Sequence, residues 1–135
     1  MLIGEQEQKL EELVKQYVAF SEMIESYEKE IKAIPADPSP AKVTSLTEAL
    51  QYAGTIRVNK ERRANLIALG NKASGMKHKI GEEIIALIPM PLVWIKVGKW
   101  AVGTYTMSGG RTIPKTELSV EPWEDKLPPL YNRTY

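Results

Sequence analysis

The sequence of 135 residues contains no cysteine, one histidine and two aspartates. The absence of cysteine excludes disulfides, thiolate nucleophiles and cysteine-ligated metals, and it fits a reducing compartment. No stretch approaches the roughly 18 uninterrupted apolar residues of a membrane-spanning helix. The N-terminal residues turn acidic at once, unlike a secretory signal peptide. We therefore expect a soluble cytoplasmic protein with no membrane partner.

Groups that could carry out catalysis are also scarce. A serine–histidine–acid arrangement would have to use His78, and the sequence has no Gly-x-Ser-x-Gly motif. His78 and Glu82 have the helical spacing of two metal ligands, but no second histidine accompanies them. The segment of residues 70–77 has glycines spaced as in a phosphate-binding loop, but it lacks the final Gly-Lys-Ser/Thr of such a loop. We expect a protein that is not an enzyme and needs no cofactor or metal.

Charge is nearly balanced over the whole chain, at a formal +1, but it is unevenly distributed. Residues 1–34 are rich in glutamate, and residues 57–79 are rich in lysine and arginine. The basic stretch could contact nucleic-acid phosphates, or it could be a solvated helix face neutralised by the first helix. The near-zero net charge favours the second interpretation. The basic residues are Arg57, Lys60, Arg62, Arg63, Lys72, Lys77 and Lys79.

Large apolar side chains recur at alternating steps of three and four between residues 10 and 34. This spacing predicts one long amphipathic helix over about residues 5–34, ended by Pro35. The aromatic members fit a helical hairpin or bundle better than a narrow parallel zipper. The stripe consists of Leu10, Leu13, Tyr17, Phe20, Ile24, Tyr27, Ile31 and Ile34.

A second helical region follows the proline-rich turn of residues 35–40. It can begin at Ser39-Pro40 or at the capping box Ser45–Glu48. Gly54 and the β-branched residues after it predict a break or kink near residues 55–59, so residues 39–88 form one kinked helix or two to three shorter ones. Pro89 ends the pattern. The face expected to meet the first helix is Val43, Leu46, Leu50 and Ala53.

The expected turn also predicts a register between the two helices. A turn centred between Asp37 and Pro38 places residue i opposite about residue 75 minus i. The acidic start of the first helix then meets the basic segment, with Glu11 near Ala64. Residues 76–88 would extend beyond the first helix, so the β-strands or another subunit must bury them. We expect self-association there, as a homo-oligomer and possibly a dimer, through Met76, Ile80, Ile84 and Leu87.

The C-terminal third changes to the alternating pattern of β-strands. Residues 92–97 and 100–106 flank Gly98-Lys99, which predicts a type II′ hairpin. This turn pairs Val97 with Trp100 and Ile95 with Val102. A turn at residues 108–111 and a short third strand over residues 116–120 follow.

Trp94 and Tyr105 share one face of this hairpin, beside the small residues Ala101 and Gly103. The face could be a shallow aromatic platform for a peptide or a nucleic-acid base. The alternative is that helix and tail cover the sheet on both sides. The usual burial of tryptophan favours this alternative. The tail of residues 121–131 is expected to be extended. Its Pro-Pro-Leu-Tyr sequence at 128–131 matches a pattern read by WW-type domains, for which chance is the better explanation.

The sequence thus predicts a single α+β domain over residues 1–135. Residues 1–88 form a long antiparallel helical hairpin, which could include a third helix. Residues 89–135 form a small antiparallel β-meander and a proline-rich C-terminal tail packed on it. The function expected is protein–protein interaction or a structural role with self-association. The alternative is a nucleic-acid-binding module that uses residues 57–79, with Trp94 and Tyr105 adding base stacking.

Overall fold

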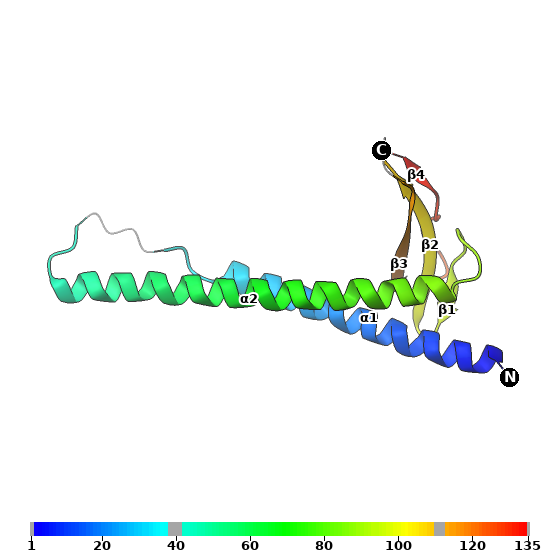
Figure 1. Ribbon diagram of the computed structural model, residues 1–135, viewed down its shortest axis with the longest axis horizontal. Helices are drawn as coiled ribbons and strands as arrows, with labels where there is room; N and C mark the ends of the chain where they lie inside the picture. Colours follow the sequence, from blue (N-terminus) through cyan, green and yellow to red (C-terminus); the bar gives the residue numbers. More distant parts are fainter. Residues whose placement is uncertain (1, 38–41, 110–112, 135) are drawn as a thin grey trace. The chain divides into compact units, whose positions relative to one another are not determined.

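The computed structural model describes residues 2–37, 42–109 and 113–134, and it has the predicted α+β architecture. Two long helices, α1 (Leu2–Ala33) and α2 (Leu46–Leu87), are followed by a small sheet (Figure 1). Its strands are β1 (Ile95–Val97), β2 (Trp100–Ser108), β3 (Lys115–Pro122) and β4 (Arg133–Thr134). The prediction of a helical hairpin with an antiparallel meander is confirmed.

The chain divides into two compact units, which we describe separately. We call residues 1–20 together with 76–135 the sheet unit, and residues 21–75 the hairpin unit. Each long helix contributes a part to both units, so the division does not fall at residue 88. The expectation that the whole chain is one domain stays a prediction.

Helix α2 is continuous over 42 residues, so the predicted break near residues 55–59 is wrong. Valine and isoleucine cost only a few tenths of a kcal/mol in a helix, and glycine about 1 kcal/mol, which a long helix can absorb. The helix begins at the second of the two predicted starts. The Glu48 N–H donates to Ser45 Oγ at 3.2 Å, while the Glu48 carboxylate accepts bonds from the N–H and hydroxyl of Thr44. These two bonds lower the pKa of Glu48. The alternative start at Ser39-Pro40 lies outside the described residues.

The face of α2 that is turned inward in the hairpin unit differs from the predicted one. Leu46 and Leu50 are 76% and 64% exposed, and Val43 is also exposed. The less exposed positions still follow the three–four spacing, but small and polar residues fill most of them, so their sequence pattern is not apolar. These positions are Ala49, Tyr52, Ile56, Asn59, Arg63, Leu66, Gly70 and Ala73, and Gly54 is the one half-buried position outside this spacing.

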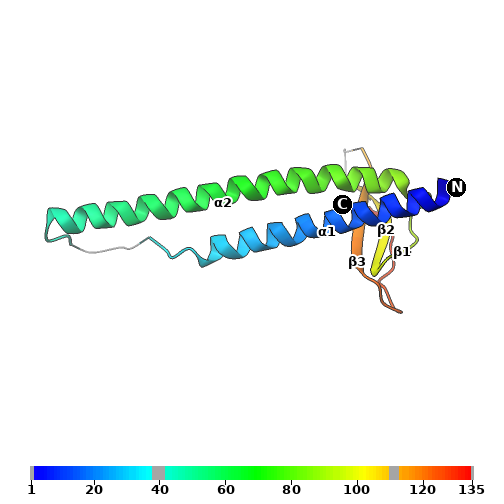
Figure 2. The same cartoon turned by 90° about the horizontal axis from the view of Figure 1, so that it is seen from below.

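The register between the helices is also offset from the prediction. Tyr27 and Ile24 line a cavity of about 240 Å³ together with Leu66 and Gly70, whereas the predicted register placed Tyr27 opposite Glu48. The prediction placed a turn between Asp37 and Pro38, and Pro38 lies outside the described residues. Within the hairpin unit the first turns of α2 run past the last turn of α1, so the two helices are offset along their axes (Figures 1 and 2).

The sheet forms as the turn chemistry predicted. Strands β1 and β2 are antiparallel, with Val97 opposite Trp100 and Ile95 opposite Val102. Gly98 has a φ of 59°, as the first position of a type II′ turn requires. Strand β3 pairs with β2 from Trp100↔Pro122 to Met107↔Lys115 and is longer than expected. The short parallel pairing of β4 with β2 was not predicted.

The core of the sheet unit lies where α1, α2 and the sheet meet. Val14, Ile84 and Val102 have no exposed surface, and Leu10, Leu13, Ile80 and Val97 surround them. Ile80 and Ile84 belong to the segment that we expected to lie beyond the first helix. The chain itself buries them, and Leu87 packs at the edge of the same cluster. Of the two alternatives predicted for these residues, burial against the strands is therefore the one that the structure has.

Ile84→Ala should lower the free energy of unfolding by about 2–5 kcal/mol, because it leaves a cavity in this core. Ile113→Ala removes an equivalent side chain that is 84% exposed and should change stability by less than about 0.5 kcal/mol. Urea denaturation followed by circular dichroism measures both. Equal losses in the two variants would contradict the core described above.

Candidate functional site

The basic segment lies along α2, and most of its side chains are exposed. In the hairpin unit Arg57, Lys60, Arg62 and Lys72 are exposed, and Arg63 is half-buried. In the sheet unit Lys79 is exposed and Lys77 lies over the Tyr17 ring, 5.1 Å from its centroid. The predicted register placed Tyr17 opposite Val58.

The glutamates of α1 do not pair with these cations among the side chains that the structure describes. The ion pairs seen there are Lys15–Glu11 at 3.5 Å and His78–Glu82 at 3.1 Å, each within one helix. Glu11 lies beside Gly98 in the β1–β2 turn, where an added Cβ would be 3.3 Å from its Oε1 atom. Within the sheet unit, Glu11 therefore lies at the β1–β2 turn, and the predicted pairing of the acidic helix start with residues 63–70 stays a prediction.

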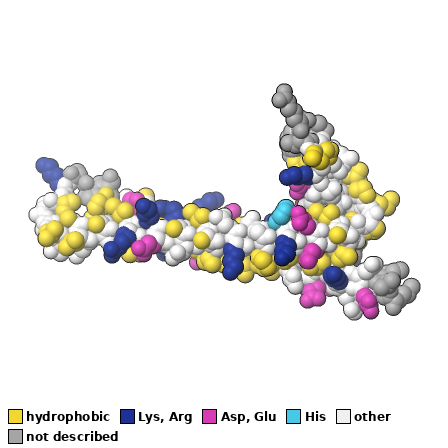
Figure 3. Space-filling view, in the orientation of Figure 1, with side chains coloured by type: hydrophobic (Ala, Val, Ile, Leu, Met, Phe, Trp, Pro, Cys, Tyr) yellow, Lys and Arg dark blue, Asp and Glu magenta, His cyan; other side chains and the backbone are white. Residues whose placement is uncertain are grey.

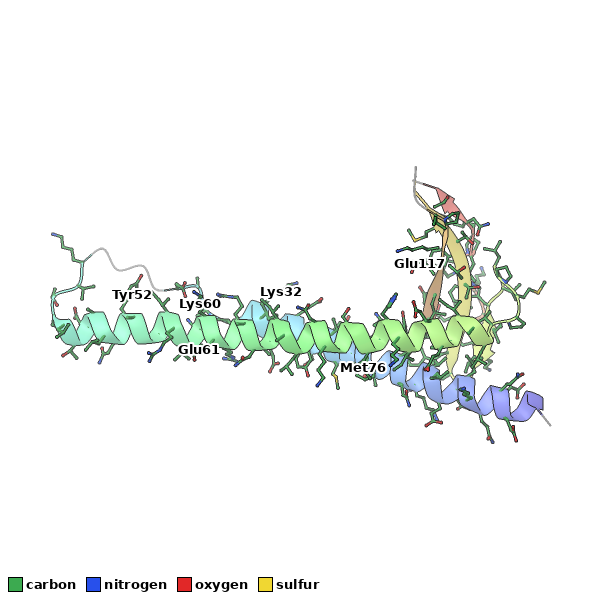
Figure 4. All side chains as sticks on the ribbon, viewed as in Figure 1. Lys32, Tyr52, Lys60, Glu61, Met76 and Glu117 are labelled. Atoms are coloured by element: carbon green, nitrogen blue, oxygen red, sulfur yellow. The ribbon has the colours of Figure 1, made fainter. Side chains whose placement is uncertain are left out.

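The basic side chains of the hairpin unit do not share one face of the helix. At about 100° of rotation per residue, Arg57 and Lys60 lie about 60° apart, whereas Arg62 is about 140° from Arg57. Figure 4 shows Tyr52 and Glu61 projecting from opposite sides of α2, an arrangement that their spacing requires. Arg63 lies about 60° beyond Lys60 and Lys72 about 60° beyond Arg57, so the five cations spread over about 260° of the helix circumference and form no single row.

His78 and Glu82 form an ordinary pair on the helix surface. Their side chains are 78% and 68% exposed. Within the described ranges, no group of three or more histidine, aspartate or glutamate side chains could hold a metal ion. This pair alone supplies too few ligands for a stable site.

Tyr17 of the sheet unit interacts with a group of polar and charged side chains, Lys77 over its ring and Glu117 and Tyr105 through their charges. Sequence reasoning placed Tyr17 in the apolar stripe of the first helix and missed this cluster. Burial raises the pKa of the Tyr17 phenol, and the negative charge of Glu117 and the neighbouring Tyr105 raise it further. Glu117 lies on β3 (Figure 4). Gly81 makes room for the ring, because an added Cβ would lie 3.3 Å from Tyr17 Cε2.

The aromatic face of Trp94 and Tyr105 is covered by the chain's own tail. The Trp94 indole N–H donates to the Pro128 carbonyl oxygen at 2.7 Å. Trp94 and Tyr105 line a groove with residues 128–131 and two β3 side chains. The interpretation that helix and tail cover the hairpin is thus supported for this face. The backbone of Trp123 also lies against the sheet, since its main-chain N–H donates to the Lys99 carbonyl oxygen at 3.0 Å.

A different apolar surface is exposed on the first turns of α2. Leu46, Leu50 and Val58 are 76%, 64% and 59% exposed. Figure 3 shows hydrophobic side chains on the surface of this part of the helix. Gln51, Gly54, Thr55, Val58 and Asn59 line a shallow hollow on this part of the helix. We call residues 46–59 the exposed end of α2. Of the four residues predicted for self-association, Met76 is 44% exposed, whereas Ile80 and Ile84 are 6% and 0% exposed. Ile80 and Ile84 are therefore buried within the sheet unit, and self-association through residues 76–87 stays a prediction.

Comparisons with protein families, with curated proteins and with solved structures found no match to this chain. No helix in the described part of the chain is long and apolar enough to cross a membrane.

The raised pKa of Tyr17 predicts a loss of stability in alkali. Between the ordinary tyrosine pKa of 10.0 and the higher folded-state pKa, the unfolded chain loses this proton while the folded chain retains it. The free energy of unfolding must therefore fall as the pH rises above about 10. Tyr17→Phe should lose less stability over this range than the wild type in urea titrations. Tyr131→Phe, at a position 55% exposed, serves as the matched control. Equal decreases of the free energy of unfolding in the wild type and in Tyr17→Phe above pH 10 would contradict the burial of this phenol.

Proposed function

We propose that this protein is a non-enzymatic interaction module that self-associates through the exposed end of α2. The observation that carries the proposal is the exposure of Leu46, Leu50 and Val58 on a helix that runs past the end of α1. Complete burial of a leucine or valine side chain contributes about 1.5–3 kcal/mol. A second helix that covers these residues would gain this free energy.

The shape of the exposed end of α2 favours another helix as its partner. Gly54 lies between the exposed leucines and Val58, and an added Cβ there would meet nothing within 4 Å. Such a hollow can receive a large side chain from a neighbouring helix, as in ridge-and-groove packing. The exposed end of α2 offers both a ridge and a groove, because it carries the leucines and the hollow at Gly54. Two copies placed antiparallel would bring the leucines of each copy to the hollow of the other, as in an isologous dimer.

Leu46→Glu combined with Leu50→Glu should abolish this association. Two charges in place of the leucines would have to be desolvated in the interface. Sedimentation equilibrium of the wild type should show a mass above 15.2 kDa that rises with concentration, and the double variant should remain at the monomer mass. Ile113→Glu, which adds a charge at another exposed apolar position, should associate like the wild type. A wild type that stays monomeric at high concentration would refute the proposal.

Nucleic-acid binding by residues 57–72 is the second candidate. It is favoured by the exposure of Arg57, Lys60, Arg62 and Lys72 and by the lack of a partner for them among the described ion pairs. It is disfavoured by their distribution around the helix. Trp94 and Tyr105 would not add base stacking while the tail lies on them.

Salt dependence tests this candidate. Arg57→Glu with Lys60→Glu removes the two cations that share a side of the helix. If the proposal holds, duplex DNA binding should weaken steeply with salt, and the slope of log K against log salt should fall by about two in the variant. Lys9→Glu on α1 is the control. Absence of binding by the wild type at low salt would exclude this function.

A further inference from the structure

The proline-rich tail lies in a groove on the sheet whose chemistry resembles that of a peptide-binding site. Two contacts hold its centre. The Trp94 indole N–H donates to the Pro128 carbonyl oxygen at 2.7 Å. The side chain of Leu130 occupies the space above Gly103, where an added Cβ would collide with it and lie 3.3 Å from Trp94 Cε3. The missing side chain at Gly103 thus creates the position that Leu130 fills.

The tail itself has the properties of a polyproline II ligand. Pro128 and Pro129 fix their own φ angles near −65°, and each proline restricts the residue before it to extended conformations. Little conformational entropy is therefore lost when this segment docks. Aromatic-lined grooves that bind such segments use this low entropy. Here Trp94 and Tyr105 supply the aromatic walls, and the indole N–H supplies a hydrogen bond to a proline carbonyl.

The tail does not fill the groove completely. A volume of about 100 Å³ remains among the lining residues. Two of the walls are polar side chains of β3, Ser119 and Glu121. The tail is connected to β3 by residues 123–126, which are exposed. Beyond the groove it is held by the bond from the Thr106 N–H to Asn132 Oδ1 at 3.0 Å and by the two-residue strand β4.

We propose that this groove is a docking site for a proline-rich segment of another protein, and that the C-terminal tail is its resident competitor. The ligand has two prolines followed by an aliphatic residue that enters the position above Gly103. It also carries a larger or cationic group that fills the remaining volume beside Glu121. The proposal concerns a surface in the sheet unit and is independent of self-association through the exposed end of α2.

The free-energy balance favours another protein over a second copy as the partner. The tail of a second copy offers the same contacts as the resident tail and in addition loses translational and rotational freedom on association. A covalently attached segment competes at an effective concentration on the order of mM. A ligand from another protein can displace the tail only if it binds the groove more tightly, and this requires contacts that the tail does not make. The unfilled volume and the Glu121 carboxylate provide such contacts.

Peptide binding to two tail-releasing variants of the full-length protein tests the proposal. Leu130→Ser removes the side chain above Gly103 and leaves the groove open. Gly103→Ala also displaces Leu130, but its methyl group fills the same position. The probe is a synthetic peptide with the sequence of residues 127–132, Leu-Pro-Pro-Leu-Tyr-Asn. Binding is followed through the indole N–H resonance of Trp94 in ¹H–¹⁵N NMR spectra.

We expect the peptide to bind Leu130→Ser at least tenfold more tightly than the wild type, in which the tail competes, and to bind Gly103→Ala no better than the wild type. Adding Trp94→Phe to Leu130→Ser removes the indole probe, so binding to this variant is followed through the backbone amide resonance of Gly103. It should be weaker by about tenfold, as expected for the loss of one hydrogen bond. A peptide with lysine in place of the tyrosine keeps both prolines and the leucine, and it should bind Leu130→Ser more tightly because Glu121 lines the same groove.

Two results would overturn the proposal. The first is absence of binding to Leu130→Ser while its spectrum retains the native sheet signals. If Leu130→Ser loses these signals, Leu130→Ala replaces it with the same expectations. The second is a Trp94 indole resonance of the wild type that shifts with protein concentration in the absence of peptide. That result would identify the tail of a second copy as the occupant.

Discussion

The structure depends on the contact of three side chains that have no exposed surface, Val14 of α1, Ile84 of α2 and Val102 of β2. These residues are far apart in the sequence, and their burial holds the first half of α1, the last turns of α2 and the sheet together as one unit. The need to bury Ile80 and Ile84 against the sheet decides where the last turns of α2 lie. Because α2 has 42 residues and α1 is shorter, the first turns of α2 are left without a helical partner in the hairpin unit. The apolar surface that we propose for self-association follows from this difference in length.

The core uses only one face of the sheet, so the opposite face can contact the C-terminal tail. Residues of β2 alternate between the two faces, so Val102 enters the core while Gly103 and Tyr105 belong to the other face. This second face carries the tail, with Trp94 and Gly103 holding Pro128 and Leu130. The sheet therefore has one face that packs on the helices and one face that carries the tail. The functions that we propose rely on apolar and aromatic contacts.

Local signals in the sequence predicted much of the fold. The three–four spacing predicted α1, the Ser45–Glu48 box predicted the start of α2, and Gly98-Lys99 predicted the strand register. The register of the helices and the inward face of α2 could not be predicted in the same way. Large apolar side chains marked Leu46 and Leu50 as the inward face, but the structure uses positions such as Gly70 and Ala73, whose small side chains give no strong apolar signal in the sequence. The sequence predicted that Trp94 and Tyr105 share a face and favoured its cover by the tail. The individual contacts of residues 128–132 were not predicted, because they join segments more than twenty residues apart.

Hydrogen–deuterium exchange of the wild type over a range of protein concentrations tests the central claim most directly. Amides in residues 46–59 should exchange rapidly at low concentration and become protected as concentration rises, because association covers this end of α2. Amides beside Ile84 and Val102 should exchange slowly and independently of concentration, since the chain itself buries them. Exchange of residues 46–59 that does not change with concentration, or protection that appears elsewhere instead, would contradict the account.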